Sequence, residues 1–215
     1  MKVVFLADSH DSNEKIAVPD GDLLIHCGDA TNEGTLPEIN RFAKWYGGLP
    51  HKHKIFVAGN HDRLFEEQPG LARQICEDYG IKYLEDRGTI IEGLHIYGTP
   101  WTPAFCNWAF NADEMDLEDR FTHIPGGLDI LVTHGPPQGV LDEVRHDFKL
   151  RNVGCRALKE MVEKQKPRIH AFGHVHPGYG QKQTERTHFI NAAIWWTQDY
   201  VTPKNTPIVI DLEPR

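Results

Sequence analysis

The chain of 215 residues is poor in cysteine and has no long apolar run. Both absences limit the classes of protein to which it can belong. Its four cysteines (Cys27, Cys76, Cys106 and Cys155) form no Cys-x-x-Cys pair, which favours free thiols in a reducing compartment over structural disulfides. The apolar N-terminal run that stops at Asp8 is too short for the hydrophobic region of a signal peptide. No segment has the length of a membrane span, so we expect a cytoplasmic protein that does not bind membranes.

Positive charge is also scarce, since 31 acidic residues outnumber 23 basic ones and the net charge is −8 with neutral histidines. An acidic surface repels nucleic-acid phosphates, so we expect no stable binding to nucleic acid. Bound divalent cations would reverse the sign locally, and the net charge therefore says nothing against an anionic substrate. The sequence lacks internal repeats and low-complexity linkers, so residues 1–215 are predicted to form a single domain.

Short apolar runs bounded by turn residues predict buried strands, and helical patterns fall between several of them. The clearest strands are Lys2–Ala7, Leu23–Cys27, Ile55–Ala58, Ile130–Thr133 and Ile169–Phe172. Predicted helices occupy residues 36–46, 71–79 and 153–162, a hairpin over 89–97 turns near Glu92-Gly93, and segments 179–190 and 208–212 read as antiparallel strands. We therefore expect an α/β fold in which two mixed β-sheets pack as a sandwich flanked by helices.

Each of the five clearest strands ends in residues of the kind that bind metals. The five loops are Asp8-Ser9-His10, Gly28-Asp29, Gly59-Asn60-His61-Asp62, Thr133-His134-Gly135 and Gly173-His174-Val175-His176. One Asp-x-His is a weak signal, because a turn aspartate and a surface histidine explain it better than a metal site does, and one Gly-Asp is weaker still. Five such loops, at the strand ends where functional residues of α/β sheets gather, form a specific pattern.

With these motifs in this order the chain resembles the calcineurin-like metallophosphoesterases, and the similarity extends over most of the chain, from Asp8 to His176. Other stretches resemble a subgroup, the small metallophosphoesterase domain-containing proteins, which hydrolyse phosphodiesters including cyclic nucleotides. These stretches are Gly98-Thr99-Pro100-Trp101, Trp108-Ala109-Phe110-Asn111, Thr133-His134-Gly135-Pro136-Pro137 and Gly178-Tyr179-Gly180. Some relatives have glycine at the position of His174, so the resemblance implies a more complete site in this chain.

The resemblance implies a site for two metal ions and assigns their ligands. One ion would bind Asp8, His10 and His176, the other would bind Asn60, His134 and His174, and Asp29 would bridge the two. Mixed nitrogen and oxygen ligands suit divalent or mixed-valence Mn, Fe or Zn, without choosing among them, better than Ca or Mg. The two metals would activate a bridging hydroxide that attacks phosphorus.

The resemblance leaves His61 without a metal and implies that it lies beside the leaving group. We predict that His61 is the general acid and that Asp62 orients it. An equally good interpretation of Asp62 is a cap on the following helix. Arg63 is more simply interpreted as a solvated arginine than as a phosphate contact.

Other histidines and aromatic residues give weaker signals. His26 lies inside an apolar strand and is predicted to be a core residue with satisfied hydrogen bonds. The histidines outside the ligand loops are predicted to be structural or exposed: His51, His53, His95, His123, His146, His170 and His188. An aromatic group of Trp101, Phe105, Trp108 and Phe110 would either stack on a nucleobase or form the core of its own loop.

The sequence thus predicts a dinuclear metal-dependent phosphoesterase, specifically a phosphodiesterase for small phosphoesters such as cyclic nucleotides. A phosphomonoesterase is an alternative. A phosphoprotein phosphatase is disfavoured, because no arginine follows Gly28-Asp29 within residues 30–34. From a different class, a metal-free scaffold of the same fold would bind protein partners, but such scaffolds lose ligand histidines and this chain keeps all seven ligands.

Overall fold

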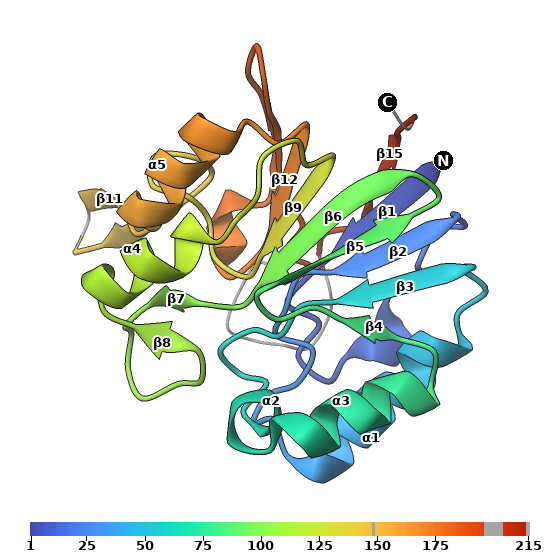
Figure 1. Cartoon of the computed structure of the whole chain (residues 1–215). Helices are drawn as coiled ribbons and strands as arrows, with labels where there is room; N and C mark the ends of the chain where they lie inside the picture. Colours follow the sequence, from blue (N-terminus) through green and yellow to red (C-terminus); the bar gives the residue numbers. More distant parts are fainter. Residues whose placement is uncertain (148, 196–203, 214–215) are drawn as a thin grey trace.

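The computed structural model describes residues 1–147, 149–195 and 204–213, which build two β-sheets packed face to face with helices outside (Figure 1). The five-stranded sheet holds, in spatial order, β15 (Ile208–Asp211), β1 (Lys2–Leu6), β2 (Leu23–His26), β3 (His53–Phe56) and β4 (Lys82–Tyr83). The six-stranded sheet holds β13 (Gly180–Gln183), β14 (His188–Asn191), β12 (Ile169–Phe172), β9 (Ile130–Thr133), β6 (Leu94–Thr99) and β5 (Arg87–Ile91).

Both sheets are mixed, as expected from the sequence. Strands β1 to β4 are parallel and β15 is antiparallel to β1. In the other sheet β14, β12, β9 and β6 are parallel, while β13 and β5 are antiparallel to their neighbours. The predicted α/β sandwich is therefore confirmed, and its parallel centre brings several strand ends to one edge.

Central strands are buried on both faces, which explains their unbroken apolar sequence. In β1, Val3 and Phe5 pack between the sheets, while Val4 and Leu6 pack on the opposite side of the strand. This alternation follows from the two-residue period of a strand, whose successive side chains point to opposite faces.

Five helices cover the outer faces of the sandwich within the described residues. Helices α1 (Leu36–Gly48), α2 (Leu64–Glu67) and α3 (Pro69–Asp78) pack on the five-stranded sheet, and α4 (Glu114–Thr122) and α5 (Arg156–Gln165) pack on the six-stranded sheet (Figure 1). Short 3-10 turns η1 (Asn13–Lys15) and η2 (His176–Gly178) and two small strand pairs, β7 (Thr102–Pro103) with β8 (Asn111–Ala112) and β10 (Glu143–His146) with β11 (Lys149–Asn152), complete the elements. No helix of the described chain is both long enough and apolar enough to span a bilayer.

The predicted elements differ from the structure mainly at their ends. Helix α1 runs through Gly47 and Gly48 instead of stopping before them, and α5 begins at Arg156 instead of residue 153. The predicted hairpin is confirmed as β5 and β6, with Glu92 and Gly93 at the turn in positive-φ conformations of 48° and 85°. All four cysteines are free thiols, as predicted.

Candidate metal centre

The loops after β1, β2, β3, β9 and β12 meet at one end of the sandwich, and they bring the predicted ligands together (Figure 1). Three sets of side chains each have donor atoms within 4.8 Å of one another: Asp8 with His10 and His176, His10 with Asp29 and His61, and Asp29 with His134 and His174. Neighbouring sets share His10 and Asp29. The sets therefore form one continuous cluster, with both sheets contributing.

Asp29 lies in the middle of this cluster and is buried. Its Oδ2 atom is 3.3 Å from Nε2 of His134 and 3.8 Å from Nε2 of His10, so one oxygen faces an imidazole on each side. Its Oδ1 atom accepts a hydrogen bond of 2.8 Å from the backbone N–H of His61. The backbone thus fixes the carboxylate in an orientation that directs its other oxygen between two ligand sets.

The amide oxygen of Asn60 lies 2.9 Å from Nε2 of His134. Because Asp29 also faces this nitrogen, His134 presents Nε2 to two oxygen atoms, an arrangement that a proton or a cation would stabilise. Burial lowers the pKa of His134, but the Asp29 carboxylate outweighs this effect and raises the pKa to about 9. A metal ion would replace that proton, since a ligating imidazole is neutral.

Asp8 joins the two halves of the site. Both of its carboxylate oxygens accept from the backbone N–H of His174, at 3.0 and 2.9 Å, and Oδ1 lies 3.4 Å from Nε2 of His176. Burial raises the pKa of Asp8, but the neighbouring His176 outweighs it and holds the pKa below its ordinary value. Asp8 is thus ionised at neutral pH, the state in which a carboxylate ligates a cation.

Three imidazoles of the cluster are oriented by carbonyl groups of a single loop, residues 27–32. Nδ1 of His134 lies 2.9 Å from the carbonyl of Cys27, Nδ1 of His10 lies 3.2 Å from that of Thr31, and Nδ1 of His61 lies 2.6 Å from the carbonyl of residue 32. A carbonyl accepts, so each Nδ1 carries the proton and each Nε2 is turned toward the centre. Metal-binding histidines commonly have this second hydrogen bond.

Several predicted ligands adopt a left-handed backbone conformation. The φ angles are 55° at Asp8, 41° at His10, 55° at Asp29 and 66° at His174. This region costs a non-glycine residue about 1–2 kcal/mol, and such strain is concentrated at functional sites. Four strained residues in one cluster indicate that ligand position, more than chain stability, determines these loops.

The glycines of the motifs leave room for ligand side chains. A Cβ atom on Gly59 would lie 2.3 Å from Oδ1 of Asp29, and one on Gly173 would lie 2.2 Å from Oδ2 of Asp8. Both distances are far shorter than a van der Waals contact. The carboxylates therefore lie directly against backbone that only glycine provides, which explains the glycine in the Gly-Asn-His and Gly-His motifs.

His61 is half-buried and lies at the edge of the cluster. Its ring packs against the indole of Trp108, with ring centroids 4.0 Å apart, and edge-on against the ring of His10 at 4.8 Å. The guanidinium of Arg63 lies 5.0 Å from the Trp108 ring and donates to the carbonyl of Asn107. Arg63 thus supports Trp108, a role that differs from both sequence interpretations.

Asp62 is buried and joins two ligand loops. Its Oδ2 accepts from the backbone N–H of Gly59 at 2.8 Å and of Ala30 at 3.3 Å, and its Oδ1 accepts from the hydroxyl and the backbone N–H of Thr31. Within the described residues it bonds neither to the His61 ring nor to the start of α2, where Arg63 is the first flanking residue. Asp62 therefore bonds the β2 and β3 loops to each other, and its predicted role in orienting His61 stays a prediction.

The aromatic group divides into two parts, and the loop-core interpretation fits Trp101 and Phe110. Phe110 is buried and packs edge-on against Trp101 at 5.4 Å, as a loop core would. Trp108 instead lies at the site against His61, and Phe105 is exposed.

The predicted core role of His26 is confirmed. The backbone N–H of Gly28 donates to Nδ1 of His26 at 3.2 Å, so the Nε2–H donates to the hydroxyl of Ser9, at 2.9 Å. Ser9 lies between two predicted ligands, and His26 therefore connects the loops after β1 and β2. It contributes structure and no ligand atom.

Comparisons with known proteins agree with this arrangement. The family described as Calcineurin-like phosphoesterase matches residues 1–178. Human metallophosphoesterase domain-containing protein 1 is 38% identical over 98% of this chain and 71% of its own length. The Caenorhabditis elegans UPF0046 protein K07C11.7 is 35% identical over 90% of this chain and 69% of its own. Phosphopantetheinyl hydrolase of Mycobacterium tuberculosis shares the fold, with a TM-score of 0.68 and 14% identity over 99% of this chain and 96% of that one.

Proposed function

Because the chain belongs to the calcineurin-like phosphoesterase family, a family of phosphoester hydrolases, we propose that it is a phosphodiesterase with a dinuclear metal centre. The proposed substrates are small phosphodiesters such as cyclic nucleotides. One observation carries this proposal, namely that a single oxygen of the buried Asp29 faces an imidazole of each of two ligand sets. This arrangement would let Asp29 bridge two cations.

The proposed ligands are those expected from the sequence. Asp8, His10 and His176 would hold one ion, Asn60, His134 and His174 would hold the other, and Asp29 would belong to both. The donor set fits transition metals, since imidazole nitrogens suit Mn, Fe or Zn and are uncommon around Mg or Ca. When bound, two such cations supply a hydroxide nucleophile and neutralise charge on the phosphate.

Burial favours the neutral form of two of the proposed ligands. It lowers the pKa of His10 to about 4 and that of His174 to about 4, so both imidazoles are neutral at pH 7. A neutral imidazole has the lone pair that a metal needs. These two ligands would therefore bind metal without first losing a proton.

His61 is the proposed general acid, which would protonate the leaving oxygen. Its Nδ1–H is fixed on the loop carbonyl of Asn32, and its ring packs on Trp108, so Nε2 has one defined direction. Half-burial leaves the ring accessible to a substrate, whereas His134 is fully enclosed. Asp62 would act as a positioning residue, because it joins the loops that carry Asp29 and His61.

The surroundings favour a diester over a monoester. A monoester dianion carries one more negative charge, and its binding would gain from a free arginine beside the ligands. Arg63, the arginine of the β3 loop, is instead directed to the Asn107 carbonyl and the Trp108 ring. Monoester hydrolysis is the second candidate, and a metal-free scaffold for protein partners is the third.

The proposal also takes residues 1–215 as a single catalytic domain in the cytoplasm. Strands β14 and β15, which follow the residues matched by the family, pair with β12 and β1 and so extend both sheets. The four free thiols suit a reducing compartment.

A substrate panel with metal analysis tests the proposal. The purified protein would be assayed with added Mn on 2′,3′- and 3′,5′-cyclic nucleotides, bis(nitrophenyl) phosphate and nitrophenyl phosphate, before and after chelation. We expect two metal equivalents and faster hydrolysis of the diesters, lost on chelation and restored by Mn. Faster monoester hydrolysis would support the second candidate, and a protein without metal or metal-rescued activity would support the scaffold.

A further inference from the structure

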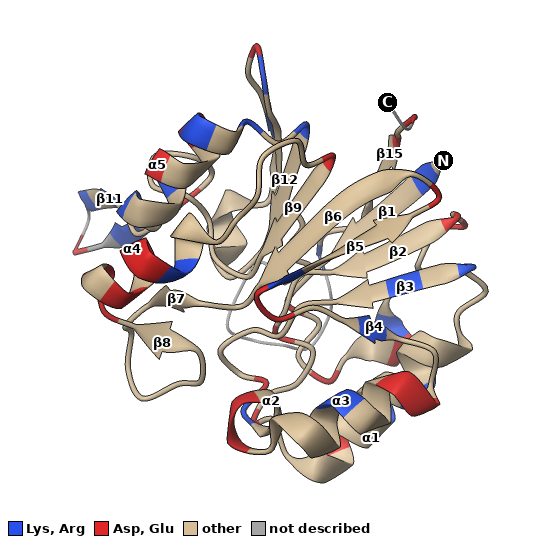
Figure 2. Ribbon diagram, viewed as in Figure 1, with Lys and Arg blue, Asp and Glu red and all other residues tan. Residues whose placement is uncertain are grey.

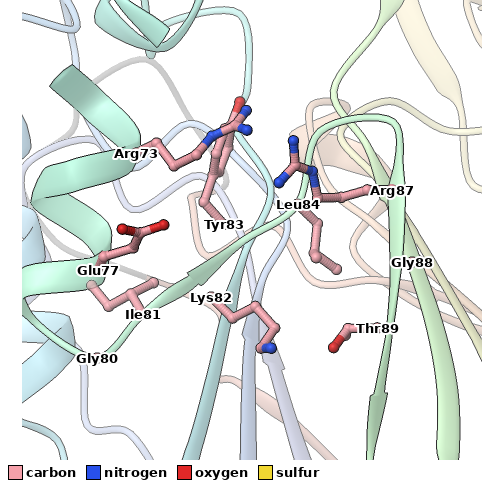
Figure 3. A pocket seen from close by; sticks show the side chains of 10 residues that line it. All are labelled: Arg73, Glu77, Gly80, Ile81, Lys82, Tyr83, Leu84, Arg87, Gly88 and Thr89. Carbon is pink, nitrogen blue, oxygen red and sulfur yellow. The ribbon is translucent and has the colours of Figure 1, made fainter. Parts of the chain in front are cut away.

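A pocket of about 420 Å³ lies on the open edge of the sandwich, between α3 and the edge strands β4 and β5 of the two sheets. Figure 3 shows the side chains that line it. None of the lining residues belongs to the proposed metal centre. The volume falls within the range of small-molecule sites, which is roughly 300–1,000 Å³.

The pocket is basic although the chain is acidic. Its lining includes three cations, Arg73, Lys82 and Arg87, and one anion, Glu77. With Glu85, which pairs with Arg73 at 3.3 Å, the local formal charge is +1 in a chain of net charge −8. Figure 2 shows basic segments on α3 and β4 at this edge of the molecule, beside acidic segments at the end of α3 and between β4 and β5. Such a concentration of positive charge favours an anionic ligand.

Arg73 has defined contacts but does not use all of its hydrogen-bond donors. One of its terminal nitrogens donates to Glu85 at 3.3 Å, and its guanidinium lies 5.7 Å from the ring of Tyr83. Its Nε atom is buried and has no hydrogen-bond partner within the described residues. A buried N–H of a charged group is costly to leave unbonded, so Arg73 keeps donor capacity that its present contacts do not use.

The other two cations are accessible to a ligand. Neither Lys82 nor Arg87 forms an ion pair within the part of the chain that the structure describes, and both are exposed. In Figure 3 the side chains of Arg73 and Arg87 reach into the same space from α3 and from β5. Two guanidinium groups that face the same space often bind phosphate in proteins, since each offers a planar pair of hydrogen-bond donors.

The floor of the pocket is apolar. Ile81, Tyr83 and Leu84 line it and are buried. They are at most 5% exposed, so the hydrocarbon or ring portion of a ligand would cover only the small part of them that reaches the surface, while its charged group meets the arginines.

We propose that this pocket binds a small organic phosphate monoester at a second site, separate from the metal centre. Arg73 and Arg87 hold the phosphate, Lys82 adds charge, and the organic portion packs on Leu84 and Ile81.

Calorimetric titration with phenylphosphonate tests this site, because its C–P bond resists phosphoester hydrolysis. On the metal-loaded protein we expect phenylphosphonate to bind more tightly than inorganic phosphate or benzoate. Loss of charge-assisted hydrogen bonds in Arg73→Gln/Arg87→Gln should weaken this binding about tenfold or more. The exposed pair Lys159→Gln/Lys164→Gln on α5 removes the same charge elsewhere and should leave binding unchanged.

A third variant, Asp29→Asn, distinguishes binding in the pocket from binding at the metal centre. The pocket of this variant should keep its affinity for phenylphosphonate. Undiminished binding by folded Arg73→Gln/Arg87→Gln, equal binding of benzoate, or complete loss of binding in Asp29→Asn would overturn the proposal. If the double variant does not fold, Arg87→Gln alone decides, since this side chain is exposed. The result does not depend on whether the protein hydrolyses diesters.

Discussion

Nε2 of His170 in β12 lies 2.9 Å from the hydroxyl of Thr133 at the end of β9. The same hydroxyl donates to the carbonyl of Gly135 at 2.7 Å, so His170 must be the donor in the first bond. In the other sheet, His26 donates in the same way to Ser9. Each sheet therefore contains a buried neutral histidine that fixes a hydroxyl beside a proposed ligand.

Both histidines should make folding stability dependent on pH. Burial lowers the pKa of His170 to about 3 and that of His26 to about 3. The unfolded chain binds protons at these positions below about pH 6.5 and the folded chain does not, so stability is lost as the pH falls. We expect a loss of about 2 kcal/mol per histidine between pH 7 and pH 5.

Urea unfolding of the chelated protein at several pH values measures this loss. His170→Gln keeps a donor for Thr133 but cannot titrate, so its stability should depend less steeply on pH. The matched control is His123→Gln at the exposed end of α4. Equal slopes in wild type and His170→Gln would mean that His170 takes up its proton at the same pH in the folded and the unfolded protein.

Asp29→Asn should lose metal as well as rate, because the amide removes a negative charge from between two cations. We expect metal affinity to fall by at least about 10–100-fold, the range seen when groups around metals are removed. Metal analysis by mass spectrometry and the rate on bis(nitrophenyl) phosphate provide the two measurements. Two tightly bound metals with normal turnover would exclude Asp29 as the bridge.

His61→Ala should keep both metals and lose rate by about 10²–10⁴-fold on substrates with poor leaving groups. The loss should be smaller for nitrophenol, which leaves without a proton. His134→Ala, by contrast, should lose metal and slow all substrates alike. Because His61 lies within 4.8 Å of His10 and Asp29, metal loss in His61→Ala would instead identify it as a ligand.

Gly59→Ala should destabilise the site, since its Cβ would lie 2.3 Å from the Asp29 carboxylate. Overpacking of this kind typically costs about 1–3 kcal/mol. Gly70→Ala in α3 is the matched control, because a Cβ there meets nothing within 4 Å and alanine favours a helix. Thermal unfolding and metal content distinguish the two, and a harmless Gly59→Ala would contradict the packing described here.

The central strands and the ligand loops could be predicted because each combines a buried apolar run with residues that turns rarely need. Helix α4 could not be predicted from the sequence, because only two of its residues, Leu117 and Phe121, are buried and the apolar Met115 is exposed. The β10–β11 hairpin is polar and has no hydrophobic period that would reveal it.

Parts of the site were also invisible in the sequence for a physical reason. The carbonyls of residues 27–32 that orient three imidazoles are backbone groups, which any residue supplies. The role of Asp62 depends on partners in a loop about 30 residues earlier, and only the packing of β2 beside β3 brings them together. His170 carried a signal, namely a histidine within an apolar strand, but its partner Thr133 lies in another strand.

The bond from the backbone of His174 to the carboxylate of Asp8 connects residues 166 positions apart in the chain. As the chain leaves the ribosome, the first proposed ligands are present long before the last. Until the loop after β12 has been made, Asp8 lacks the backbone N–H of His174 that donates to it. If the cluster holds two ions as proposed, both would load only after synthesis has passed His176. A shortage of metal would then act on a chain whose ligand loops have all been made, and not while they are being made.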